Sequence, residues 1–222
     1  MTAYRVYIKS KNSISYQAST CLGSEADVVL NRQCTVAMTE LIEEPFALAE
    51  GDTVVAIVEA LNDIGYSEPS EENQSGATVQ VVPHAPATTP SRGSLTGTSQ
   101  VEVLFEEITE DGGSPILSYA LEIDRGDGAG FEIVVGDPDD SLDTTVLITD
   151  SILSGQTYTF QYRARNIHGW SNYSDPAQIL ASSVPSEPLN VVTSIEAGST
   201  QVSIAWDAPS DLGGDGITID FF

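Results

Sequence analysis

Residues 201–214 read QVSIAWDAPSDLGG, and residues 100–113 read QVEVLFEEITEDGG. The two segments align without a gap at an offset of 101, and both end in a Gly-Gly pair. In each segment apolar residues alternate with other residues, as in Val202, Ile204 and Trp206, which is typical of a strand with one buried face. A strand-and-turn unit therefore occurs at least twice in the chain.

A second pair of segments supplies the other half of the repeated unit. Residues 48–70 align with residues 152–174 at an offset of 104, with an alanine, an asparagine, two glycines and a serine among the residues shared in register. Met1–Tyr4 aligns with residues 116–119, and residues 217–222 repeat the same start again. Short strands with regular turn signals indicate a β-sandwich. The helical prediction is confined to one turn at residues 39–44.

Composition excludes several classes of function. The chain has 222 residues, 8 of them Lys or Arg and 33 Asp or Glu, giving a net charge of −25. Such a charge repels nucleic-acid phosphates and anionic membrane surfaces. The 41% of hydrophobic residues allow a core. No stretch approaches the roughly 18 apolar residues of a membrane span, so we expect neither nucleic-acid binding nor membrane insertion by this segment.

Catalysis has no support in the sequence. The common nucleophile, zinc-protease and phosphate-loop motifs are missing. The two histidines, His84 and His168, lie in a linker and in a turn, and neither is accompanied by a partner pattern. We therefore predict a protein that is not an enzyme and needs no cofactor or metal.

The pattern resembles the fibronectin type III module over nearly the whole chain. The resemblance rests on Pro185-x-x-Pro188 with Trp206, on Leu153-x-Gly155-x-Thr157-Tyr158, and on the run from Ala164 to Ser171. It implies an all-β protein of tandem antiparallel β-sandwiches of the fibronectin type III or immunoglobulin-like kind. Two departures stay apolar: Val54 replaces the corner tyrosine and Phe105 replaces the core tryptophan.

A narrower resemblance concerns residues 34–52, CTVAMTELIEEPFALAEGD. They look like modules of large tandem-repeat surface proteins of ciliated protists. This resemblance implies an extracellular or cell-surface location.

Laid against the module, the chain has an unusual frame. Residues 1–82 correspond to a module from its third strand onward, 83–184 to a complete module, and 185–222 to the first strands of another. Either the chain is a window of a longer tandem chain, or it assembles head to tail by completion of half-modules. The residues expected at the assembly ends are Met1, Tyr4, Ile217, Phe221 and Phe222. Both ends encode the start of a third strand, so one copy is redundant in a simple complementation.

The two cysteines, Cys21 and Cys34, fall in the first module. The extracellular resemblance implies a disulfide, which is worth about 3 kcal/mol in the chain-entropy model. The alternative is two buried free thiols.

Other motifs are weaker. Asn73-Gln-Ser75 and Asn172-Tyr-Ser174 are candidate N-glycosylation sites if the chain is secreted. Arg125-Gly126-Asp127 spells an integrin tripeptide, but a hairpin turn explains it better. Acidic runs such as residues 137–143 suit a solvated surface better than a calcium site.

These observations predict a structural component of an extracellular or cell-surface fibre or stalk. Its partners would be neighbouring copies or further modules of the same chain, with glycans as further candidates. The alternative is an adhesion or binding module that recognises a protein or glycan through loops carrying Tyr66, Trp170 and Tyr173. An accessory domain of an enzyme is a weaker third possibility.

Overall fold

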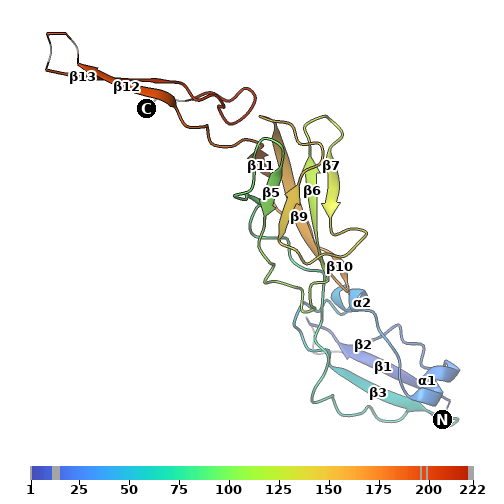
Figure 1. Ribbon diagram of the computed structural model, residues 1–222. Helices are drawn as coiled ribbons and strands as arrows, with labels where there is room; N and C mark the ends of the chain where they lie inside the picture. The colour runs from blue at the N-terminus through green and yellow to red at the C-terminus, as the bar shows by residue number, and fades with distance from the viewer. Residues whose placement is uncertain (1, 12–15, 196, 199, 220–222) are drawn as a thin grey trace. The chain divides into compact units, whose positions relative to one another are not determined.

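The computed structural model describes residues 2–11, 16–195, 197–198 and 200–219. It divides into two compact units (Figure 1). The first comprises Met1–His84, Glu110–Ile116 and Asn166–Trp170. The second comprises Ala85–Thr109, Leu117–Arg165 and Ser171–Phe222. Three of the expected assembly ends, Met1, Phe221 and Phe222, lie outside the described residues.

The elements are short and almost all are strands. Up to residue 84 they are β1 (Ala3–Lys9), β2 (Tyr16–Ala18), α1 (Ala26–Asn31), α2 (Met38–Ile42) and β3 (Ala56–Leu61). Eight further strands run to residue 180 and two more follow: β4 (Ser91–Arg92), β5 (Val101–Leu104), β6 (Ser118–Asp124), β7 (Phe131–Val135), β8 (Thr145–Ile148), β9 (Thr157–Asn166), β10 (Gly169–Trp170), β11 (Ala177–Leu180), β12 (Leu189–Ile195) and β13 (Val202–Asp207).

The second unit contains the complete sandwich. One antiparallel sheet runs β7-β6-β9-β11 and the other runs β4-β5-β8. Between them lie side chains that are almost completely buried, with Val101 and Val103 on one sheet and Leu121 and Ile123 on the other. Burying each large apolar side chain stabilises the fold by roughly 1.5–3 kcal/mol. The predicted all-β architecture of antiparallel sandwiches is confirmed.

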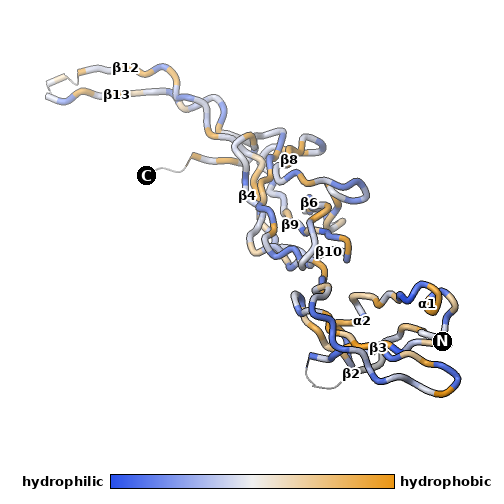
Figure 2. The backbone as a smooth tube through the Cα atoms, turned by 90° about the horizontal axis from the view of Figure 1, so that it is seen from below, coloured by the Kyte–Doolittle hydropathy of each residue, from blue (hydrophilic) through white to orange (hydrophobic). Residues whose placement is uncertain are grey.

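The first unit has a three-stranded antiparallel sheet, β2-β1-β3. Its core gathers at one end of that sheet, where Ile8 packs with Leu41, Phe46, Leu48 and Val79. Hydrophobic residues occur along α2 and β3, as the backbone coloured by hydropathy shows (Figure 2). Part of the same sheet face extends beyond this core, as described below.

One helix was not predicted. α2 overlaps the predicted helical turn and begins one residue before it, but α1, between the two cysteines, was missed. α1 has six residues and is capped by the following Arg32, whose backbone is left-handed (φ 55) and whose N–H donates to the Val28 carbonyl at 2.8 Å. Six residues are too few to show a helical period, and such a helix depends on tertiary support.

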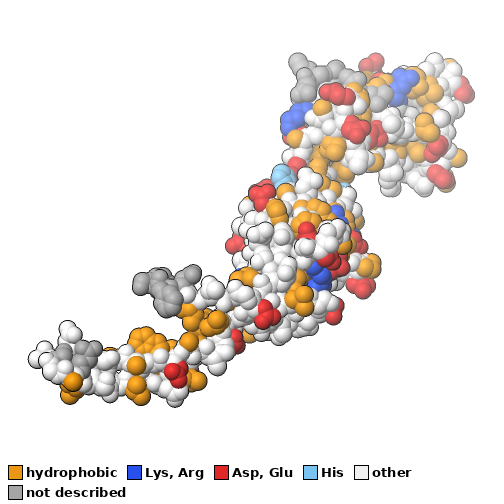
Figure 3. All heavy atoms as spheres, turned by 90° about the horizontal axis from the view of Figure 1, so that it is seen from above, with side chains coloured by type: hydrophobic (Ala, Val, Ile, Leu, Met, Phe, Trp, Pro, Cys, Tyr) orange, Lys and Arg blue, Asp and Glu red, His pale blue; other side chains and the backbone are white. Residues whose placement is uncertain are grey.

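The last two strands form an antiparallel hairpin in which Ile195 pairs with Val202. Every residue of β12 is exposed, and β13 is nearly as exposed. Hydrophobic side chains stand along this part of the molecule (Figure 3). No second sheet covers the hairpin among the described residues.

Candidate assembly surfaces

The β13 strand presents an uncovered apolar row. Its aligned strand in the complete sandwich, β5, is buried, although the two carry the same alternation. Val202, Ile204 and Trp206 are 61%, 58% and 61% exposed, whereas the aligned Val101, Val103 and Phe105 are 0%, 0% and 6% exposed. The facing sheet covers β5, whereas no second sheet covers β13 among the described residues.

A second apolar surface, only partly covered, lies on the sheet of the first unit. β1 and β3 pair so that Tyr4 lies beside Ala60 and Val6 beside Val58. In the complete sandwich the aligned pairs are Tyr119 with Ala164 and Leu121 with Tyr162, all at most 4% exposed. In the first unit Val58 is 37% exposed and the other three are partly buried. We call the face formed by Tyr4, Val6, Val58 and Ala60 the open face.

The open face forms the floor of a groove. The groove has a volume of about 460 Å³ and is lined by Tyr4, Val6 and Val58 on the sheet side. Its opposite wall comes from α1 and the segment after it, with Val28, Arg32, Gln33 and Cys34. The groove is therefore mainly apolar, with one cation and one amide at its edge.

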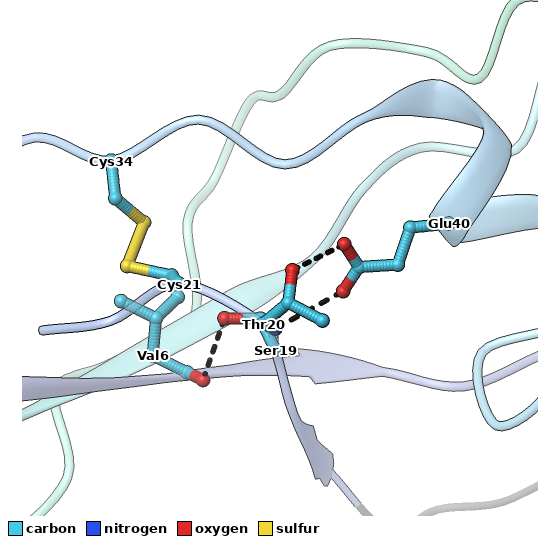
Figure 4. The surroundings of a disulfide bond; sticks show 6 residues. All are labelled: Val6, Ser19, Thr20, Cys21, Cys34 and Glu40. Atoms are coloured by element: carbon cyan, nitrogen blue, oxygen red, sulfur yellow. Dashed lines mark hydrogen bonds between the residues drawn. A yellow bond between two sulfur atoms is a disulfide. The ribbon is translucent and has the colours of Figure 1, made fainter.

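The disulfide between Cys21 and Cys34 holds this wall (Figure 4). The two Cα atoms lie 6.0 Å apart. Next to it, the Ser19 hydroxyl donates to the Val6 carbonyl at 3.2 Å, and the Thr20 N–H donates to the Glu40 carboxylate at 3.1 Å. The structure thus contains the disulfide that the resemblance implied. The Ser19 and Thr20 hydrogen bonds tie the segment before Cys21 to β1 and to α2.

Two glycines mark equivalent close approaches that the sequence comparison missed. The Tyr4 N–H donates to the Gly23 carbonyl at 2.9 Å. A Cβ atom on Gly23 would lie 1.8 Å from the Tyr4 oxygen, and one on Gly136 would lie 1.7 Å from the Tyr119 oxygen. Only glycine fits in such contacts. The two sheets therefore share a detail beyond the aligned strands.

Each linker is bonded to the Gly-Gly turn that follows it. In the first unit the Val81 N–H donates to the Gly112 carbonyl at 2.8 Å. In the second unit the Ser183 N–H donates to the Gly213 carbonyl, also at 2.8 Å. The fully buried Asn166 amide adds bonds to the Val81 and Asp111 carbonyls at 2.7 and 2.8 Å. We call these two arrangements the linker clasps.

Both charged residues of the Arg-Gly-Asp tripeptide form hydrogen bonds within the protein. Arg125 donates to the Glu132 carboxylate and to the Asp150 and Ser151 carbonyls. The Asp127 carboxylate accepts the Ala129 N–H at 2.9 Å. These contacts match the turn explanation given above.

Two of the three loop aromatics stack against arginines of their own unit. The Arg5 guanidinium lies 3.7 Å from the Tyr66 ring centroid, and that of Arg163 lies 4.6 Å from the Tyr173 centroid. Loss of solvent and a hydrogen bond to Glu122 raise the pKa of Tyr173 to about 12. Trp170, the third aromatic, forms β10 and is partly buried.

The two sequons differ in structure. The Asn73 amide oxygen accepts the Ala56 N–H at 2.7 Å, and its nitrogen donates to the Val54 and Ser75 carbonyls at 3.0 Å each. Asn172 is exposed, while Ser174 is buried and accepts the Tyr162 N–H through its hydroxyl. Asn73 thus bonds the backbone around β3, whereas Asn172 faces solvent.

The remaining candidates assemble no reactive centre. His84 lies 2.8 Å from Glu50, and the His168 ring lies 3.1 Å from the Gln80 amide oxygen. Within the described ranges, no three His, Cys, Asp or Glu residues are grouped to hold a metal ion. In the same ranges, no helix has the length and apolar character needed to cross a membrane.

Comparison with known proteins finds similarity to titin and to contactin. No family model matches the chain. Titin of Drosophila melanogaster is 28% identical over 166 residues, which are 72% of this chain and 1% of titin. A crystal structure of domains A168–A170 of titin has 22% identity, covers 62% of this chain and 44% of its own, and gives a TM-score of 0.43. A crystal structure of the chicken contactin FN1–FN3 domains has 16% identity and gives a TM-score of 0.44. The match covers 93% of this chain and 67% of the contactin chain.

By sequence, the chain is therefore similar to a short part of titin, and its fibronectin type III character stays a prediction. It spans about 1% of the length of the titin that it matches and less than half of the titin structure. The resemblance to ciliate surface proteins stays a prediction.

Proposed function

We propose that this chain is a structural component of an extracellular or cell-surface fibre or stalk. Neighbouring copies, or further modules of the same chain, cover its two apolar surfaces. The observation that supports this is the contrast between two aligned strands, β5 buried and β13 exposed. A row such as Val202, Ile204 and Trp206 is rarely left in water unless a partner covers it.

Energetics favour an apolar contact between copies. Complete burial of a large apolar side chain is worth roughly 1.5–3 kcal/mol, so three of them offset a large part of the roughly 4–15 kcal/mol that association costs. The hairpin and the open face are different surfaces, so a contact between them is head to tail and extends into a filament unless the rotation closes a ring.

Charge limits where copies can meet. The chain carries a net charge of −25, so copies repel one another at long range. β12 has no charged residue and β13 has Asp207 alone, which makes the hairpin an exception on an acidic protein. Salt screens the repulsion and leaves apolar attraction in place.

The mechanical role would come from stiff modules and bonded linkers. We propose the boundaries 1–82, 83–184 and 185–222 for the two partial modules and the complete one. The two linker clasps bond the chain at residues 81 and 183 to the turns at 112 and 213. Such bonds limit the freedom of a connection that would otherwise be flexible.

A second candidate is an adhesion module that binds a protein or glycan through the loop of residues 60–67. This loop lines a hollow of about 450 Å³, and it exposes Ile64 and Tyr66. Saturable binding to a glycan array by chains that stay monomeric would favour this role over the fibre.

The fibre is tested by sedimentation velocity and electron microscopy of the purified chain over a wide concentration range, at low and at high salt. We expect linear oligomers whose mean length rises with concentration and with salt. A chain that remains monomeric at every concentration and salt level contradicts the proposed assembly.

A further inference from the structure

The segment that follows β3 bonds to the edge of that strand through side chains as well as backbone. The Ser67 hydroxyl accepts the Ala60 N–H at 3.0 Å, and the Ser70 hydroxyl accepts the Val58 N–H at 3.1 Å. The backbone N–H groups of the two serines donate to the Ala60 and Val58 carbonyls at 2.8 and 3.0 Å. Each serine therefore satisfies both backbone groups of one residue of β3.

Asn73 continues this pattern one step further along the strand. Its amide oxygen accepts the Ala56 N–H at 2.7 Å, and its nitrogen donates to the Val54 carbonyl at 3.0 Å. Serine and asparagine suit such contacts, because their short side chains readily bond to nearby backbone groups. The N–H groups of three alternate residues of β3 therefore have partners. We call residues 67–73 the edge strap.

The two serine contacts recur in the complete sandwich. The hydroxyls of Ser171 and Ser174 accept the N–H groups of Ala164 and Tyr162 at 3.1 and 3.2 Å. The backbone N–H groups of the same serines donate to the carbonyls of the same two residues, both at 2.8 Å. All four residues lie at the offset of 104 that relates the two modules. The contacts are therefore a property of the repeated module.

The two modules differ at the third position of the pattern. Phe160 aligns with Ala56, and it pairs with Ala177 at the start of β11. In the first unit the side chain of Asn73 bonds at this place instead. A strand that pairs at an edge brings a second row of backbone groups with it, whereas a side chain closes the edge and adds no such row.

The edge strap is itself a poor template for pairing. Its three bonding side chains are three residues apart, while the residues that they meet on β3 are two apart, so the strap is not a regular strand. Pro69 has no N–H to give to another chain, and the acidic residues Glu68, Glu71 and Glu72 add charge. Proline and charge are features that keep sheet edges from pairing.

We propose that the edge strap is a conformational device that keeps β3 from adding a strand of another chain. An edge with free N–H and C=O groups is a template for strand addition, and the strap occupies those groups. The strand that the strap excludes has the chemistry of β11, an extended segment with alternating apolar residues. The device goes beyond the proposed fibre, since it protects the side of a sheet whether or not the chain assembles.

Hydrogen exchange on the full chain tests whether the strap closes the edge. In Asn73→Ala, exchange at the Ala56 amide should accelerate roughly two- to tenfold, the range for one lost hydrogen bond. The neighbouring Ile57, which pairs with Tyr7 of β1, should keep its rate and is the internal control. Ser75→Ala is the matched control variant, because no hydrogen bond of the Ser75 hydroxyl is seen within the described residues.

A strand peptide tests what the closed edge excludes. A fluorescent peptide of residues 175–182, which contains β11, is titrated with the chain at concentrations at which that chain sediments as a monomer. Asn73→Ala, and more so the triple variant with Ser67→Ala and Ser70→Ala, should bind the peptide at least about tenfold more tightly than wild type. Ser75→Ala should match wild type, and a scrambled peptide should bind none of them. Circular dichroism checks the fold of each variant.

Two results would overturn the proposal. An unchanged exchange rate at Ala56 in Asn73→Ala would show that the strap does not close the edge. Accelerated exchange without peptide binding by any variant would show that the strap only braces the chain and excludes no strand. Neither result bears on the fibre, which is tested by the association of wild type alone.

Discussion

The phenol oxygen of Tyr158 accepts a hydrogen bond from the backbone N–H of Leu153, 2.7 Å away. Tyr158 is 1% exposed and lies near the beginning of β9, so this bond fixes the chain where it enters the strand. At the aligned position of the first unit stands Val54, which has no hydroxyl. The complete sandwich therefore has a corner constraint that the first unit lacks.

Tyr158→Phe should destabilise the complete sandwich by about 1–3 kcal/mol. The substitution keeps the buried ring but leaves the Leu153 N–H without its acceptor. Urea denaturation measures the change in the free energy of unfolding. Tyr66→Phe, which removes the same atom from an exposed ring, is the control. Equal effects of the two substitutions would contradict a role for the corner.

Gly112→Ala should open the first linker clasp. Gly112 has φ +74, and a Cβ atom there would lie 2.3 Å from the Val81 carbonyl oxygen. Gly51→Ala is a matched control, because Gly51 has φ +77 but nothing within 4 Å of its added Cβ. The control isolates the backbone cost of about 1–2 kcal/mol. Gly112→Ala should cost clearly more, and hydrogen exchange at the Val81 amide should accelerate. Equal costs would show that the clasp does not constrain the linker.

Removing the disulfide should destabilise the first unit and leave the complete sandwich intact. The Cys21→Ser, Cys34→Ser variant loses about 3 kcal/mol in the chain-entropy model. Hydrogen exchange resolves the two units, and protection should fall in β1 and β3 while β6 and β9 keep theirs. Alkylation of the native protein checks the premise, since two reactive thiols without reductant would disprove the bond.

If the chain is expressed through a eukaryotic secretory pathway, we expect a glycan at Asn172. Its side chain faces solvent, whereas the Asn73 amide is engaged in three hydrogen bonds. Intact-mass measurement should show one glycan that Asn172→Gln removes and Asn73→Gln does not. A glycan retained in Asn172→Gln would reverse the assignment.

The sequence predicts the strands well because alternation is a local property. Val101 and Val103 alternate with other residues whether or not a second sheet covers them, so the pattern alone gives β5 and β13 alike. The pattern cannot predict α1, because this helix is too short to show a period and lies in a loop that a disulfide closes. It also misses Gly23 and Gly136, whose need for glycine arises from contacts with Tyr4 and Tyr119 in the folded sheet.

Alkaline pH should weaken the complete sandwich partly through Tyr173. Loss of solvent, and then the bond to Glu122, raise the pKa of Tyr173 to about 12, above the ordinary pKa near 10 of an unfolded tyrosine. The neutral phenol is therefore favoured in the folded state. Its contribution is fully present below pH 10 and is lost as the pH rises from about 10 to about 12.

Burial also raises the pKa values of Tyr119 and Tyr162, so the stability of the Tyr173→Phe variant should keep a weaker dependence on pH. The pH dependence of the free energy of unfolding is measured by urea denaturation from roughly pH 8 to pH 11.5, the range set by these pKa values. The free energy of unfolding should fall more steeply in wild type than in Tyr173→Phe, and parallel curves would show that the Tyr173 phenol does not contribute.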